Sequence, residues 1–177
     1  MIIAAPIATP RLRLRSLTEV DASDAYLAWM NDAQTNQYLE SRFQKLERSD
    51  LARFIVSCNE AANSLLLAIM LHADGRHIGN IKLGPIDAHH LFADIGLLIG
   101  DRRDWGQGYA REAIAAVAEY AFDRLQLHKL TAGCYASNVD SRKAFEACGF
   151  SVEGVRRAQY RSGDRWEDAF LLGRLAP

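Results

Sequence analysis

The stretch that most constrains the fold is DRRDWGQGYAREAIAAVAEYAF, residues 101–122. Two glycines, Gly106 and Gly108, stand directly before a segment whose apolar residues repeat at helical spacing, which predicts an amphipathic helix from Tyr109. The first N–H groups of a helix have no partner within the helix, and they carry a partial positive charge. Glycines let an anion approach these amides, so the pattern favours a pyrophosphate site. The competing interpretation is an ordinary helix start in which the glycines have no ligand.

The glycine loop does not match the common nucleotide motifs. In the dinucleotide pattern G-x-G-x-x-G the third glycine would fall at Arg111, and no acidic residue ends the next predicted strand to bind a ribose. A Gly-Lys-Ser/Thr ending is also absent, which argues against a P-loop. NAD and ATP are therefore disfavoured as ligands.

The rest of the chain alternates between strand and helix patterns. Helices are predicted from Thr18, as N-cap, to about Trp29, and from Ser49 or Asp50 to about Ala61. Asp74-Gly75 and Ser162-Gly163-Asp164 lie between extended segments and predict hairpins. A short helix is predicted between Asn138 and Gly149. Further strands are predicted at 11–15, 91–100 and 128–136, and the order β-α-α-β-β-β-α-β-α-β-β indicates an α+β or mixed α/β sheet.

Length and composition limit the class of protein. The 177 residues fit one domain, 1–177, and no linker or repeat divides them. The net charge of −1 gives no overall field for nucleic acid or an acidic membrane surface. No apolar run is long enough for a membrane span and the first residues lack a signal-peptide pattern, so we expect a cytoplasmic protein.

Cysteine and histidine spacing gives no metal or disulfide pattern. The three cysteines, Cys58, Cys134 and Cys148, are odd in number and never form C-x-x-C. The histidines show no helical pairing of metal ligands, and His89 and His90 fall in a predicted turn. We therefore expect no metal site.

Several motifs, taken in order, resemble one family. Arg103 to Ala110 resembles the R/Q-x-x-G-x-G/A acyl-CoA loop of the GNAT superfamily of N-acetyltransferases. ADIGLLIG before it, NVDS at 138–141, CGF at 148–150 and EGVRRAQYRSGDRWED are similar to the RimJ/RimL-like branch. The resemblance covers about residues 10–175 and implies a mostly antiparallel sheet in which strands four and five, here 91–100 and 128–136, splay apart around acetyl-CoA.

The resemblance also implies a set of cofactor-binding residues. The backbone of Leu97, Leu98 and Ile99 would bind the pantetheine, and one N–H there would polarise the thioester carbonyl. Residues 103–110 would wrap the pyrophosphate, while the helix that Asn138 opens would contact the far side of the cofactor. The full predicted set is Leu97, Leu98, Ile99, Arg103, Trp105, Gly106, Gln107, Gly108, Tyr109, Ala110, Asn138, Ser141 and Phe145.

Acetyl transfer to an amine needs a proton acceptor when the amine arrives protonated. Asp94 is the candidate base because many members carry a glutamate in this role, and its alternative role is structural pairing with an arginine or a turn. Phe145 stands where many members have a tyrosine acid, so Ser141 is the candidate acid; its alternative role is a hydrogen bond at the helix start. Gln159 stands where RimL has a glutamate, and an amide cannot accept that proton.

The acceptor itself carries no motif. Tyr38, Gln159 and Tyr160 are candidate acceptor-binding residues, although aromatic residues at such positions also serve as plain packing. The function that the resemblance implies is an acetyl-CoA-dependent N-acetyltransferase acting on a small-molecule amine, an amino sugar or a protein N-terminal amine, with a homodimer as an open possibility. The alternative is a non-catalytic acyl-CoA sensor of the same fold.

Overall fold

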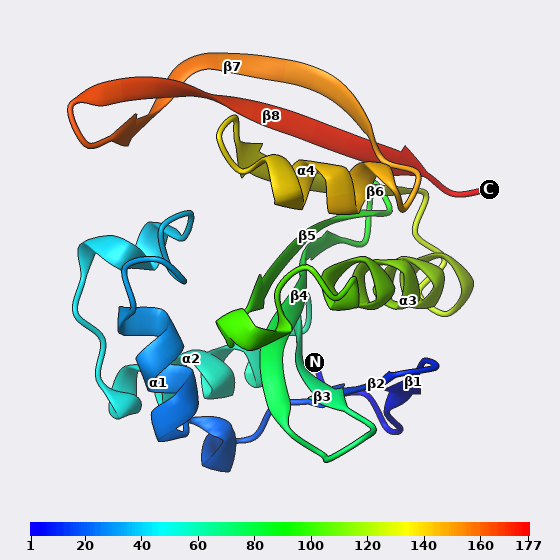
Figure 1. The fold of residues 1–177 in the computed structure, drawn as a ribbon. Coiled ribbons are helices and arrows are strands. Elements are labelled where there is room, and N and C mark those ends of the chain that lie inside the picture. The colour runs from blue at the N-terminus through cyan, green and yellow to red at the C-terminus, as the bar shows by residue number, and fades with distance from the viewer.

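The computed structural model describes residues 1–177 as one mixed sheet with helices on both faces (Figure 1). The strand order is β1-β2-β3-β4-β5-β6-β8-β7, and every neighbouring pair is antiparallel except β5 and β6. The mixed α/β fold with a mostly antiparallel sheet is confirmed. The strands are β1 (Ile7–Ala8), β2 (Leu12–Ser16), β3 (Leu65–Leu71), β4 (His77–Asp87), β5 (Phe92–Ile99), β6 (Lys129–Tyr135), β7 (Ser151–Ser162) and β8 (Arg165–Leu175).

Helices divide between the two faces of the sheet and form two cores. The larger core holds 26 buried residues and includes the inner faces of α3 (Tyr109–Asp123) and α4 (Val139–Glu146). The smaller core holds 10 buried residues and includes those of α1 (Asp24–Asn31) and α2 (Arg48–Glu60). One face of β5 and β6 therefore packs against the larger core, and the other lies on the side of α1 and α2.

The sequence of α3 explains why this segment forms a helix. Alanine has the highest helix propensity, and the apolar stripe of α3 includes Ala113, Ile114 and Val117, each 0% exposed. The helix begins at Tyr109, as predicted, and its N-cap is Gly108. The buried stripe fixes where the glycine loop sits relative to the sheet.

Both predicted hairpins form. Gly75 and Gly163 adopt the left-handed conformation, with φ of +71° and +61°, which glycine accepts without steric cost. The hairpins join β3 to β4 and β7 to β8, as predicted, and β5 pairs with β4 to extend the antiparallel part of the sheet. The two-residue strand β1 was not predicted because it is too short to show a period.

The predicted helix from Thr18 to Trp29 is wrong in one respect, because it is two segments. Thr18 caps only a 3-10 turn, η1 (Glu19–Asp21), and Ser23 then caps α1 by accepting from the N–H of Tyr26. The Asp21 carboxylate is held by Arg15 at 2.7 Å and by the Thr18 N–H at 2.8 Å. This anchoring to β2 turns the chain before a second helix can start.

None of the helices combines the length and the apolar character that crossing a bilayer requires.

Candidate active site

The sheet opens between β5 and β6. Their parallel pairing is limited to Phe92↔Lys129, Ala93↔Leu130 and Asp94↔Thr131. Beyond this point β5 continues along β4 to Ile99, while β6 continues along β8 to Tyr135. The two strands therefore diverge after Asp94, which is the splay expected for strands four and five.

The alternation of the β4–β5 ladder decides which backbone groups face the splay. The Gly100 N–H donates to the Ile78 carbonyl, so even-numbered residues of β5, including Leu98, direct their backbone groups toward β4. Leu97 and Ile99 then direct theirs toward the splay. The indole of Trp105 donates to the Ile99 carbonyl at 2.8 Å, which agrees with this orientation and leaves Leu97 as the residue with both groups facing the splay.

The glycine loop lies where β5 ends and α3 begins. Gly106 and Gly108 have φ of +71° and +79°, so both need the left-handed conformation that glycine tolerates. Neither of them, nor Gln107, donates a backbone hydrogen bond, and no side chain caps α3. The amides of Tyr109 and Ala110, in the first turn of α3, have no carbonyl one turn earlier to accept from them. The loop therefore presents a row of amides at the positive end of a helix, which is suited to a phosphate or pyrophosphate.

The start of this loop is held rigidly by ion pairs. Asp104, which is buried, accepts two hydrogen bonds of 3.0 Å from Arg76, and Arg76 also pairs with Asp74. These carboxylates raise the pKa of Arg76, so it stays charged. Arg103, a predicted cofactor ligand, is bound to Asp101 at 2.6 Å and lowers the pKa of that carboxyl to about 2. Arg103 would have to leave Asp101 to bind a phosphate.

Asp94 lies at the point where the strands part. Its carboxylate accepts a hydrogen bond from the Thr131 hydroxyl, and it is on the α1/α2 side of the sheet because its neighbours Ala93 and Ile95 belong to the larger core on the other side. Further along the same face the chain has glycines, Gly96 on β5 and Gly133 on β6. A methyl group built at Gly96 meets nothing within 4 Å, and one at Gly133 meets only the Phe170 carbonyl at 3.8 Å. The face of the splay beside Asp94 is therefore open.

The remaining predicted residues, Asn138, Ser141 and Phe145, lie at the start of α4 or within it, and only some of them could reach a ligand. The Asn138 side chain accepts from the Ser141 N–H at 3.3 Å, as an N-cap does. Ser141 is half-buried and its hydroxyl makes no hydrogen bond within the protein. Phe145 is 2% exposed and packs edge-on against Phe150, so the structure places its ring in the core and gives it no exposed face for a ligand.

An aromatic cluster joins the end of β6 to the last hairpin and to the segment after α1. Tyr135 stacks on Tyr160 with ring centroids 4.1 Å apart and lies 5.6 Å from Tyr38, so two of the predicted acceptor residues come together. Gln159, the third, is exposed on β7 and joins no contact in this cluster.

Sequence reasoning missed the centre of this cluster. The Tyr135 hydroxyl donates to Glu40 at 2.5 Å and accepts from Arg42 at 2.8 Å; both come from the 3-10 turn η2 (Glu40–Phe43). Burial and the bond to Glu40 raise the pKa of Tyr135 to about 12, against the opposing effect of Arg42, so this hydroxyl remains a donor. No motif marks η2, and no local signal links it to a residue far along the chain.

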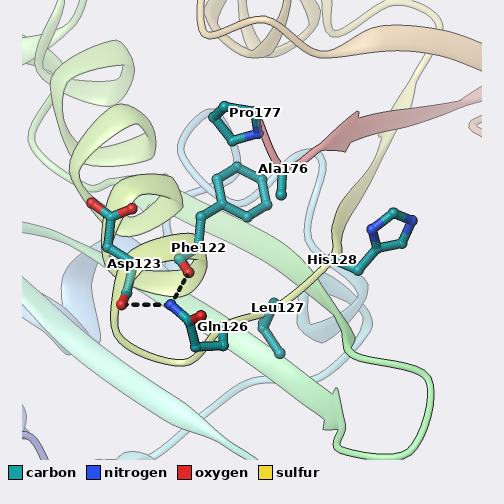
Figure 2. Close-up of a pocket in the computed structure, with 7 residues that line it drawn as sticks. All are labelled: Phe122, Asp123, Gln126, Leu127, His128, Ala176 and Pro177. Carbon is teal, nitrogen blue, oxygen red and sulfur yellow. Dashed lines mark hydrogen bonds between the residues drawn. The ribbon is translucent and has the colours of Figure 1, made fainter.

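A pocket lies at the far end of α3. It is lined by Phe122, Asp123, Gln126, Leu127, His128, Ala176 and Pro177 (Figure 2). The Gln126 amide donates to the carbonyls of Phe122 and Asp123, which satisfies the C-terminal end of the helix. Since a 15-residue helix is about 22 Å long, this pocket is remote from the glycine loop, and the Gln126 amide that lines it is used in capping.

Comparisons with known proteins agree with this geometry. A family model described as an acetyltransferase (GNAT) domain matches residues 11–151. The uncharacterized N-acetyltransferase p20 of Bacillus licheniformis is 25% identical over 169 residues, 94% of each chain. The probable N-acetyltransferase YjcK of Bacillus subtilis (strain 168) is 36% identical over 110 residues, 62% of this chain and 60% of that protein.

A solved structure supports the fold. The spermidine N-acetyltransferase from Vibrio cholerae, crystallised in complex with CoA and spermine, superposes with a TM-score of 0.83 at 22% identity, covering 95% of this chain and 97% of that one. The family model covers most of the chain, including the splay and the glycine loop. The chain therefore belongs to the GNAT acetyltransferase family, and it is an acyltransferase.

Proposed function

We propose that this protein is an N-acetyltransferase of the RimJ/RimL-like type that binds acetyl-CoA between β5 and β6 and acetylates a primary amine. The observation that carries the proposal is the divergence of the two strands after Asp94↔Thr131, directly beside the amides of the glycine loop. Acetyltransferases of this family use acetyl-CoA as cosubstrate, and the residues of the splay and the glycine loop fit it. The loop amides suit its diphosphate, and the backbone of Leu97 suits the amide-rich pantetheine.

Acetyl-CoA supplies an acetyl group as a thioester, whose carbonyl carbon can be attacked by an amine nitrogen. In this proposal the Leu97 N–H donates to the thioester carbonyl oxygen, where negative charge develops. The amine nitrogen forms its bond to carbon as the carbon–sulfur bond breaks. Binding both partners in one splay also supplies much of the rate, because orientation replaces a bimolecular encounter.

Asp94 is the proposed proton acceptor. A primary amine has a pKa of about 10, so it arrives mostly protonated and must lose a proton before attack. The carboxylate faces the open side of the splay, and the Thr131 hydroxyl fixes its orientation. Because aspartate is short, we propose that one water carries the proton from the amine to Asp94.

Ser141 is the proposed donor of a proton to the departing sulfur. Its hydroxyl makes no hydrogen bond within the protein and lies in the first turn of α4, which packs on α3. Phe145 supplies no hydroxyl and is buried. We therefore expect Ser141→Ala to lower kcat while leaving the Kd of acetyl-CoA unchanged, and an unaltered kcat would assign Ser141 to helix capping alone.

We propose that the acceptor enters from the α1/α2 side, over Gly96 and Gly133. These positions leave space where other residues would place a side chain, and the cluster of Tyr38, Tyr135 and Tyr160 borders the far end. The spermidine N(1)-acetyltransferase of Vibrio cholerae, 30% identical over 91 residues, is named for an amine acceptor, which supports an amine here. We include small-molecule amines and protein N-terminal amines in the proposal.

The test follows free thiol while purified protein is incubated with acetyl-CoA and a panel of simple amines, amino sugars and short peptides with a free N-terminus. We expect thiol release that depends on one class of acceptor. Tight binding of acetyl-CoA with no acceptor-dependent release across the panel would instead support the alternative, a sensor module of the same fold.

A further inference from the structure

We propose that Arg11 is a positioning residue that sets the direction of the glycine-loop amides toward the diphosphate of acetyl-CoA. The inference rests on the proposed function, because it concerns how that cosubstrate is held. Arg11 directly precedes β2, which β3 and β4 separate from β5 and the splay in the order of the sheet. It was not singled out from the sequence.

The contacts of Arg11 converge on the end of the glycine loop. Its Nη1 donates to the Gln107 carbonyl at 2.9 Å, and its Nε donates to the Glu112 carboxylate at 2.6 Å. The guanidinium also lies 4.7 Å from the centre of the Tyr109 ring, within range of a cation–π interaction. One side chain therefore holds residues on both sides of the helix start.

The bond to Gln107 fixes the next amide. In a trans peptide the carbonyl and the following N–H point in opposite directions. Because Arg11 binds the Gln107 carbonyl, the Gly108 N–H points away from the Arg11 guanidinium, and we infer that it is thereby directed toward the diphosphate. A left-handed glycine can adopt more than one peptide orientation at low cost, so an external contact is needed to select this one.

The presence of Glu112 supports a positional role over a purely electrostatic one. A carboxylate in the first turn of α3 works against binding of a diphosphate a few residues away. It is nevertheless bound tightly: it accepts from the Thr9 hydroxyl at 2.6 Å and from the Arg11 N–H at 2.8 Å. Its role in this arrangement is to hold the guanidinium of Arg11 against the loop.

The geometry requires an arginine. The planar guanidinium reaches a carboxylate through Nε and a carbonyl through Nη1 at the same time, and a lysine ammonium on a flexible chain does not reproduce this fork. Charge alone therefore does not restore the arrangement.

The experiment measures the Kd of coenzyme A by calorimetry for wild type, Arg11→Gln and Arg11→Lys, with Arg13→Gln as matched control. Arg13 is an exposed arginine two residues along, within β2; it lies opposite Met70 of the smaller core, on the face away from α3, and it makes no hydrogen bond or ion pair. We expect both Arg11 variants to weaken binding about tenfold, as loss of a charge-assisted hydrogen bond does, and Arg13→Gln to bind as wild type does. Restoration of wild-type affinity in Arg11→Lys would show that charge, not position, matters and would overturn the inference.

A second comparison uses a thioester without phosphates. With S-acetylpantetheine as donor, the kcat/KM of Arg11→Gln should equal that of wild type, whereas with acetyl-CoA it should fall about tenfold. An equal fall with both donors would indicate general damage to the fold and would contradict the inference. Glu112→Gln distinguishes a positional from an electrostatic role by the direction in which the Kd of coenzyme A changes. We expect weaker binding, although a negative charge near the phosphates is removed. Tighter binding would count against a positional role.

The two proposals fail in different ways. Wild-type protein that does not bind coenzyme A would overturn the proposed function and this inference together. Wild-type protein that binds coenzyme A, with Arg11→Gln binding equally well, would overturn this inference alone.

Discussion

The Thr131 hydroxyl on β6 donates a hydrogen bond to the Asp94 carboxylate on β5 at the last paired position before the two strands diverge. This contact fixes a proton acceptor at the base of the splay. It also joins the two strands that must remain in register for the splay to start at the same place. Both consequences can be tested separately.

Replacing Asp94 with asparagine should lower kcat by about a hundredfold for simple alkyl amines, because general-base contributions are of this order. The penalty should be smaller for an α-amine with a pKa near 8, which is partly neutral already. Steady-state kinetics with both acceptor types checks this. Thr131→Val is the partner variant: it keeps the carboxylate but loses its orienting hydroxyl, so a smaller fall in kcat is expected. Equal kcat in wild type and Asp94→Asn would remove Asp94 from the mechanism.

Filling the open face beside Asp94 should block the acceptor without damaging the fold. Gly133→Val adds a side chain whose first carbon meets only the Phe170 carbonyl at 3.8 Å, and valine suits a strand. We expect the kcat/KM for the acceptor to fall more than tenfold, to an extent set by steric exclusion, with the Kd of coenzyme A and the melting temperature little changed. Gly154→Val, at a glycine of β7 whose added carbon meets Leu171, is the control outside this face. Full activity of Gly133→Val would place acceptor entry elsewhere.

The hydroxyl of Tyr135 should matter for the acceptor and not for the cosubstrate. Tyr135→Phe removes the group that ties Glu40 and Arg42 to the end of β6, so the segment around η2 loses its anchor. We expect the kcat/KM for the acceptor to fall about tenfold, the size of effect expected for lost charge-assisted bonds, with the Kd of acetyl-CoA unchanged. Tyr160→Phe is the matched control, because the Tyr160 ring stacks on Tyr135 and its hydroxyl makes no hydrogen bond within the protein. Both variants keep the stacked rings, so a loss of the same size in Tyr160→Phe would show that the effect is not specific to the bonds of the Tyr135 hydroxyl to Glu40 and Arg42.

Acid stability should depend on Asp21. Burial disfavours its charged form, but hydrogen bonds from Arg15 and Thr18 outweigh this and lower the pKa of Asp21 to about 2. A carboxyl with a lowered folded-state pKa stabilises the protein above its unfolded pKa of about 3.9, and that contribution is lost as the pH falls toward 2. We expect Asp21→Asn to lower the free energy of unfolding by about 2 kcal/mol near neutral pH. Urea denaturation over a range of pH should show this difference shrinking below about pH 4, and a constant difference would contradict the assignment.

Much of the fold could be predicted from local sequence patterns. The α3 stripe and the Asp74-Gly75 and Ser162-Gly163-Asp164 turns depend on neighbouring residues, so each could be predicted from its own segment. The break between η1 and α1 was missed because two adequate N-caps, Thr18 and Ser23, lie within one helical pattern. The choice between them is made by the ion pair of Asp21 with Arg15, which no local period reveals.

The candidate site was predictable only where a motif or a resemblance marked it. The glycine loop has a local pattern, and the splay was expected from the family resemblance. Tyr135 and Glu40 are 95 residues apart in sequence, and the bond between them depends on how η2 returns to the sheet. Arg11 and Gln107 are 96 residues apart and were missed for the same reason.

A crystal structure of the protein with coenzyme A tests the central claim most directly. The account predicts the diphosphate within hydrogen-bonding distance of the amides of Gly108, Tyr109 and Ala110, with the pantetheine running past Leu97 between β5 and β6. Coenzyme A bound at another surface, with the glycine loop making no contact to its phosphates, would contradict the account.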